Sequence, residues 1–205
     1  MPENAAELRS RIQALRKSLD PSERARIQKR IDIQLFGLLR DRLRPAAGRC
    51  WGLHRPLPWE WSLPVSTGFL RESGVALVYP RMRDPADRSQ GMSWHLADES
   101  IPAHWEACRG MPLLLEPRGD LPEIDPARMD GVWVPGVAFS ERGERMGTGG
   151  GFYDFFLARH PSLVRVAGAA DFQLLRELPG QRPDEPRMSH IAGEERVLSF
   201  TDDGN

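Results

Sequence analysis

The chain has 205 residues, of which 40% are hydrophobic, so it is long enough and apolar enough to fold around a core of its own. Its 28 basic and 29 acidic residues give a formal net charge of -1, which excludes a bulk electrostatic attraction to nucleic acid or to a membrane surface. Two cysteines without close spacing, Cys50 and Cys108, indicate two buried thiols instead of a disulfide framework or a zinc site. We predict a single domain over residues 1–205.

No apolar run has the form of a signal peptide or approaches the roughly 20 residues that a membrane-spanning helix needs. We therefore expect a soluble protein of the cytoplasm with no membrane partner. A nucleic-acid-binding module is also disfavoured, because no stripe of basic residues interleaved with aromatic residues is present.

Two helices in series are predicted before the first strand. The first covers residues 5–18, where apolar residues recur at three- and four-residue spacing: Leu8, Ile12, Leu15 and Leu19. Asp20 then serves as the N-cap of the second helix, with Pro21 as its first residue and Glu23 as the partner in a capping box. This helix ends near Pro45 and carries an apolar stripe: Ile27, Ile31, Ile33, Leu35, Leu38 and Leu39.

Short apolar runs then alternate with helical or polar segments. Strands are predicted at residues 50–53, 75–81, 92–96, 130–139 and 164–170, with helices at 65–73 and 152–159. The unbroken apolar run at 75–81 is typical of a buried parallel strand, and the alternation at 92–96 is typical of an edge strand. This order predicts an α/β fold: a three-layer domain with a mostly parallel sheet and an N-terminal helical pair.

A glycine-rich segment, RMGTGGGFYD at residues 145–154, is the strongest candidate for a functional site. A predicted strand leads into it and a predicted helix leads out, so its glycines would let the backbone approach an anion beside the unpaired N–H groups of a helix N-terminus. Arg145 adds a cation, and Asp154 adds a carboxylate that could hold a metal. The spacing matches neither the P-loop nor the dinucleotide fingerprint, so a plain glycine-rich turn is the alternative.

The wider segment resembles the signature of the 5-formyltetrahydrofolate cyclo-ligase (methenyltetrahydrofolate synthetase) family. VPGVAF at 134–139, Gly143, the glycine-rich segment and Leu157 follow the family pattern V-P-G-x-A-F-D-x-x-G-x-R-L-G-x-G-x-G-Y-Y-D-x-x-L at nearly every position. The resemblance implies a monomeric enzyme that uses ATP and Mg²⁺ to convert 5-formyltetrahydrofolate to 5,10-methenyltetrahydrofolate, with release of ADP and phosphate.

The same resemblance implies an ATP site. Arg9 and Arg145 would offset the charge of the phosphates, and Asp154 would hold Mg²⁺ against phosphate oxygens. The residues expected to cradle the phosphates are Gly147, Thr148, Gly149, Gly150, Gly151, Phe152 and Tyr153. Arg145 and Tyr153 are the expected catalytic residues, although for Tyr153 packing beneath the loop is favoured over stacking on the ligand. The substitution Asp154→Ala is expected to abolish Mg-dependent turnover and to leave the fold intact.

The folate site implied by the resemblance centres on Glu60, which stands where the family has a glutamate that binds the pterin. A carboxylate can accept hydrogen bonds in pairs from the adjacent N–H groups of a pterin. Trp59 and Trp61 flank Glu60, and their flat rings suit a flat ligand. The alternative for both tryptophans is that they cover the edge of the core.

Three positions depart from the family pattern. Ala5 stands where relatives place a phosphate-binding lysine, Thr148 where an aromatic or basic residue is common, and Ser189 where relatives place an aspartate near the metal. With Ser189 in that place, a metal would be held by Asp154, phosphates and water, an arrangement that Mg²⁺ tolerates. The departures favour an alternative hypothesis: a relative that binds nucleotide or folate without the cyclo-ligase reaction, or that runs another ATP-dependent reaction.

Overall fold

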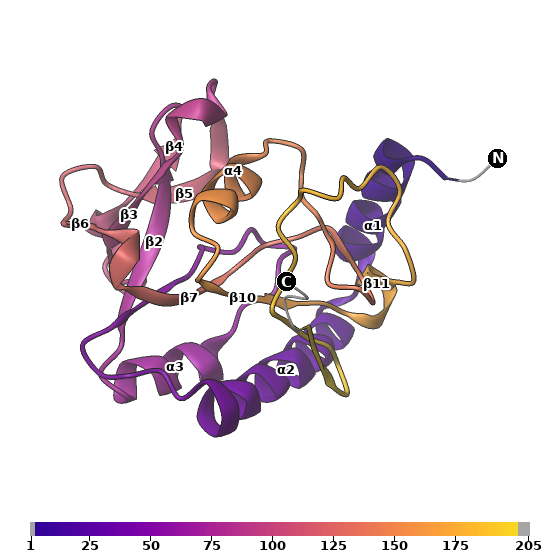
Figure 1. Cartoon of the computed structure of the whole chain (residues 1–205), viewed down its shortest axis with the longest axis horizontal. Coiled ribbons are helices and arrows are strands. Elements are labelled where there is room, and N and C mark those ends of the chain that lie inside the picture. The colour runs from indigo at the N-terminus through magenta and orange to yellow at the C-terminus, as the bar shows by residue number, and fades with distance from the viewer. Residues whose placement is uncertain (1–2, 201–205) are drawn as a thin grey trace.

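The computed structural model describes residues 3–200. An eight-stranded sheet lies at the centre of the fold (Figure 1). The strand order is β13-β12-β10-β7-β1-β2-β3-β6. The five strands from β12 to β2 run parallel to one another. At one edge β13 pairs antiparallel with β12, and at the other β3 pairs antiparallel with β2 and β6 antiparallel with β3. The strands are β1 (Cys50–Gly52), β2 (Ala76–Met82), β3 (Met92–Leu96), β6 (Glu123–Ile124), β7 (Met129–Trp133), β10 (Val164–Gly168), β12 (His190–Ala192) and β13 (Val197–Ser199).

Helices cover both faces of this sheet, which confirms the three-layer α/β prediction (Figure 1). Side chains alternate across the strands, so Trp51 and Trp133 face α2 (Pro21–Leu38) and α3 (Pro64–Glu72), while Val132 faces α4 (Phe152–Arg159). Among residues 3–200, no helix is both long enough and apolar enough to cross a membrane. Cys50 and Cys108 are free and buried, as predicted.

A smaller unit lies beside the main sheet and contains the glycine-rich segment. It is a three-stranded sheet of order β11-β8-β9, made of β8 (Ala138–Ser140), β9 (Arg145–Met146) and β11 (Leu174–Leu175). Leu8 and Ile12 of α1 (Ala5–Ser18) pack on it, which fixes the first helix against the strand that leads into the glycines. A separate hairpin, β4 (Trp105–Cys108) and β5 (Met111–Pro117), lies against β2.

The predicted strand over 130–139 is wrong, because it is two strands in two sheets. The main-sheet strand β7 ends at Trp133, and Pro135 and Gly136 separate it from β8. Proline cannot donate to a strand ladder, and a Cβ on Gly136 would lie 2.3 Å from the Phe139 ring, so only glycine allows this close approach. The edge-strand prediction for 92–96 is also wrong, since the two-residue strand β6 pairs with its outer side.

The helical pair is confirmed, with corrections at its ends. Asp20 accepts hydrogen bonds from the backbone N–H groups of Ser22 and Glu23, but the Glu23 carboxylate pairs with Arg26 instead of completing a capping box. The second helix continues beyond α2 as a π-helical turn, Leu39–Leu43. Ile33, placed in the apolar stripe by its residue type, is 48% exposed.

Candidate active site

The glycine-rich segment links β9 to α4 as predicted, and two of its glycines have left-handed backbones. Gly149 has φ +110° and Gly151 has φ +71°, a region that favours glycine. Gly151 is the N-cap of α4, and no side chain caps this helix end. The first N–H groups of α4 therefore remain available to an anion, with the positive end of the helix dipole behind them.

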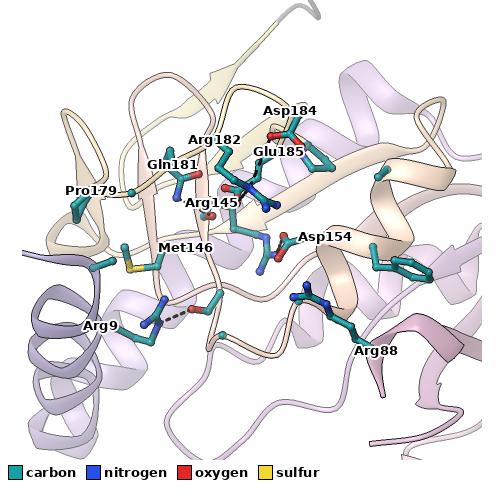
Figure 2. A pocket seen from close by; sticks show the side chains of 18 residues that line it. Arg9, Arg88, Arg145, Met146, Asp154, Pro179, Gln181, Arg182, Asp184 and Glu185 are labelled. Atoms are coloured by element: carbon teal, nitrogen blue, oxygen red, sulfur yellow. Dashed lines mark hydrogen bonds and ion pairs between the residues drawn. The ribbon is translucent and has the colours of Figure 1, made fainter. Parts of the chain in front are cut away.

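Two cavities meet at this segment. One, the polar cavity, has a volume of about 490 Å³ and is lined by four arginines and three carboxylates: Arg9, Arg88, Arg145, Arg182, Asp154, Asp184 and Glu185 (Figure 2). The other, the large cavity, has a volume of about 730 Å³ and is lined mainly by apolar and aromatic side chains, among them Trp59, Tyr79, Trp105 and Tyr153. Five residues line both cavities and form their common wall: Arg145, Gly147, Gly149, Gly151 and Asp154.

The large cavity opens at the carboxyl ends of the parallel strands, where ligands of α/β sheets bind. Its lining includes His54, which follows β1, Met82 at the end of β2, and Pro135, which follows β7. The structure brings the glycine-rich segment to this end of the strands, although the strand that leads into it belongs to the smaller sheet.

The expected cation and the expected metal ligand are paired with each other. One terminal nitrogen of Arg145, Nη2, donates to Asp154 Oδ1 (Figure 2). The other, Nη1, donates to the Pro135 carbonyl at 3.0 Å. The Arg145 side chain is only 5% exposed, whereas that of Asp154 is 37% exposed. Asp154 Oδ2 makes no hydrogen bond or ion pair with residues 3–200 that the structure records, so one carboxylate oxygen remains open to the cavity.

Two buried donors lack a partner among the described residues: Arg145 Nε, which belongs to the common wall, and the hydroxyl of Tyr153, which lines the large cavity. Burial raises the pKa of Tyr153, so the hydroxyl keeps its proton and can donate. Buried polar groups without a partner are uncommon in folded proteins. Tyr153 also packs against the buried cluster between the main sheet and α4, the packing role that the sequence favoured.

Arg9 reaches the segment from α1. Its Nε donates to the Gly147 carbonyl at 2.9 Å, which ties the first helix to the start of the loop (Figure 2). Ala5 lies one turn before Arg9 and also lines the polar cavity. The remaining residues expected to cradle phosphates do not line the polar cavity and face the large one: Thr148, Gly150, Phe152 and Tyr153.

Glu60 and Trp59 line the large cavity, but Trp61 does not. Glu60 is held in place by the Leu57 N–H, which donates to its Oε2 at 3.0 Å, and this oxygen lies 3.6 Å from His54 Nε2. Burial lowers the pKa of His54 below its usual 6.5, against the pull of the Glu60 carboxylate. Trp61 is 5% exposed and donates to Gln173 Oε1 at 2.7 Å, so it belongs to the core.

Sequence reasoning missed the polar-cavity residues Arg88, Arg182 and Glu185. They come from polar loops with no periodicity, and no local pattern signals that these loops close over the glycines.

Ser189, expected near the metal, accepts a hydrogen bond from the Arg165 N–H at 3.0 Å and lines neither cavity. Over residues 3–200, no group of three or more His, Cys, Asp or Glu side chains could hold a metal ion.

The fold and the glycine loop define an α/β protein in which a helix N-terminus without a side-chain cap lies beside a cavity lined by arginines and carboxylates. The chain belongs to the 5-formyltetrahydrofolate cyclo-ligase family, whose model matches residues 48–193. This finding confirms the resemblance read from the sequence.

Curated relatives match the chain over part of their length. The 5-formyltetrahydrofolate cyclo-ligase of Escherichia coli K12 is 42% identical over 74 residues, which cover 35% of this chain and 41% of the relative. That of Haemophilus influenzae is 33% identical over 81 residues, covering 38% of this chain and 43% of the relative. The matched segments therefore span about two fifths of these relatives.

Solved structures share the fold over almost the whole chain. The 5,10-methenyltetrahydrofolate synthetase of Aquifex aeolicus superposes with a TM-score of 0.72 at 22% identity, covering 98% of this chain and 95% of that one. The enzyme of the same name from Mycoplasma pneumoniae gives a TM-score of 0.71 at 18% identity, with 94% and 98% covered. At these identities the comparison establishes the architecture.

Proposed function

We propose that this protein catalyses the ATP-dependent conversion of 5-formyltetrahydrofolate to 5,10-methenyltetrahydrofolate, with release of ADP and phosphate. The observation that carries the proposal is the common wall: Arg145, Asp154 and three glycines border the polar cavity on one side and the large cavity on the other. A triphosphate in the first cavity and a flat heterocycle in the second would meet there. The resemblance further implies a monomer, and we retain the cytoplasm as the proposed location, as expected from the sequence.

The polar cavity is the proposed ATP site. Free N–H groups at the start of α4 and the arginines around the loop suit the negative charge of a phosphate chain. Asp154 would hold Mg²⁺ through its open oxygen, because this ion favours one or two carboxylates together with phosphate oxygens and water. When bound, the ion would neutralise charge on the phosphate oxygens.

The large cavity is the proposed folate site. Glu60 is fixed by a backbone N–H and keeps capacity to accept from the adjacent N–H groups of a pterin. The rings of Trp59, Trp105 and Tyr153 line the same space and suit a flat ligand. We retain Glu60 and Trp59 as substrate-binding residues and assign Trp61 to the core.

In the proposed reaction, the formyl oxygen attacks the γ-phosphorus of ATP and ADP leaves. N10 then attacks the resulting iminophosphate carbon, phosphate departs with the former formyl oxygen, and N10 loses its proton to water. No covalent bond to the protein is needed, so its task is to position the reactants and to stabilise charge. Arg145 and Tyr153 are the proposed catalytic residues, because Arg145 belongs to the common wall where the phosphoryl group would transfer, and Tyr153 lines the large cavity that this wall borders.

The test is to incubate purified protein with 5-formyltetrahydrofolate and Mg²⁺, with and without ATP, and to follow the absorbance of methenyltetrahydrofolate. An increase in this absorbance that requires ATP supports the proposal. ATP binding without product would instead favour the alternative, a divergent member of the family, for which Ala5, Thr148 and Ser189 are the motivating residues.

A further inference from the structure

Arg88 lies against the glycine loop from a distant part of the chain. It belongs to η2 (Arg88–Gln90), a short helical turn between β2 and β3. Its Nη1 atom lies 2.7 Å from the position that a Cβ on Gly151 would occupy, and its Cδ lies 3.1 Å from it. The side chain thus rests on the loop where α4 begins, and it points into the polar cavity (Figure 2).

The segment around Arg88 is built to hold this position. Asp87 accepts a hydrogen bond from the Ser89 N–H at 2.9 Å, and the Arg83 N–H donates to the Gly91 carbonyl at 3.1 Å, which closes the loop. Gly91 packs against α4, since a Cβ there would lie 3.6 Å from the Phe155 ring. The start of α4 and this loop are therefore one packed unit.

The other arginines of the polar cavity are already engaged. Arg9 donates to the Gly147 carbonyl, Arg145 is paired with Asp154, and Arg182 lies 3.2 Å from a Glu185 oxygen. Arg88 is exposed, and its guanidinium makes no hydrogen bond or ion pair within residues 3–200 that the structure records. It is the one arginine lining this described cavity whose donors are all uncommitted.

We propose that Arg88 is a phosphate-binding residue that clamps the outer phosphates of ATP against the glycine loop. It acts at the Gly151 end of the loop, whereas Arg9 is fixed at the Gly147 end (Figure 2). The planar guanidinium can donate two parallel hydrogen bonds to phosphate oxygens, beside the N–H groups of the α4 N-terminus. This inference rests on the proposed function, since it takes the polar cavity as the nucleotide site.

The test compares wild type, Arg88→Ala and Arg88→Lys for binding of ATP, ADP and AMP by calorimetry, with thermal melts to verify folding. Loss of a bidentate charged contact predicts that Arg88→Ala weakens ATP binding about tenfold or more, with AMP binding almost unchanged. Arg88→Lys keeps the charge and loses the planar fork, so it should fall between. In turnover, KM for ATP should rise more than kcat falls.

Two further variants sharpen the result. Arg83→Ala removes an arginine of the same segment that pairs with Glu123 and does not line the cavity, so ATP binding should not change. Ala5→Lys, added to Arg88→Ala, places a new cation in the same cavity and should restore part of the lost affinity. If Arg88→Ala binds ATP as tightly as the wild type does, the inference about Arg88 is overturned and the proposed function is not. A wild type that binds no ATP would overturn the proposed function as well.

Discussion

Replacing Asp154 tests stability and chemistry at once. The sequence led us to expect that Asp154→Ala abolishes turnover and leaves the fold intact. The structure modifies that expectation, because Asp154 is the carboxylate partner of the nearly buried Arg145. Its removal leaves the guanidinium with one hydrogen bond, to the Pro135 carbonyl.

The cost follows from the exposure of the two side chains. Breaking a buried pair by removing one partner costs about 3–5 kcal/mol, whereas an exposed pair contributes about 0–1 kcal/mol. Arg145 is 5% exposed and Asp154 is 37% exposed, so water screens one side of the pair. We expect Asp154→Ala to lower the free energy of unfolding by about 1–3 kcal/mol. Each kcal/mol corresponds to roughly 2–4 °C in Tm for a domain of this size.

Asp154→Asn separates the two roles. The amide oxygen can still accept from Arg145, so the loss of stability should stay below about 1 kcal/mol. A neutral amide is a poorer ligand for Mg²⁺, so turnover should still be lost. The assay is urea unfolding alongside the ATP-dependent absorbance measurement, and Glu123→Ala, at an ion pair with both side chains 50% exposed, serves as the stability control. An Asp154→Ala protein as stable as this control would refute the pairing argument, and wild-type turnover by Asp154→Asn would refute the metal role.

Three other predictions concern the stability of the fold that holds the site. Asp32, buried in α2, accepts from the Val65 and Ser66 N–H groups at 2.8 and 3.0 Å, so Asp32→Ala should cost about 2–4 kcal/mol in urea unfolding by leaving these donors unpaired. Gly131→Ala would place a Cβ 2.5 Å from the Trp51 ring, and this overpacking should cost about 1–3 kcal/mol, measured as a lower Tm. Because burial lowers the pKa of His54, the unfolded chain binds more protons, so stability should fall as pH drops below 6.5, and less steeply in His54→Phe.

Each of these has a matched control. Asp41, 55% exposed beside Arg40, should tolerate alanine within about 0.5 kcal/mol. A Cβ on Gly37 would meet nothing within 4 Å, so Gly37→Ala in α2 should be neutral or stabilising. His190 also has its pKa lowered by burial, so His54→Phe should keep part of the pH slope. Unchanged stability in Asp32→Ala or Gly131→Ala, or an unchanged slope in His54→Phe, would contradict the corresponding argument.

The sequence by itself determined the features that depend on neighbours along the chain. Apolar spacing placed the helix at Ala5–Ser18, and Asp20 with Pro21 marked the start of the next one. The glycines within 147–151 predicted a loop between a strand and a helix. A left-handed backbone and a close approach of the backbone to other atoms are local requirements that glycine meets.

Tertiary structure alone decided which distant side chains meet at that loop. Arg88 comes from a polar segment 63 positions before Gly151, and it meets the loop where the neighbouring Gly91 packs on α4. Trp59 and Trp61 look equivalent in the sequence, yet one lines the large cavity and the other donates to Gln173 in the core. Periodicity in the sequence indicates which face of one helix or strand is apolar. A cavity is formed by several elements packed together, and the sequence pattern of any one segment does not determine that packing.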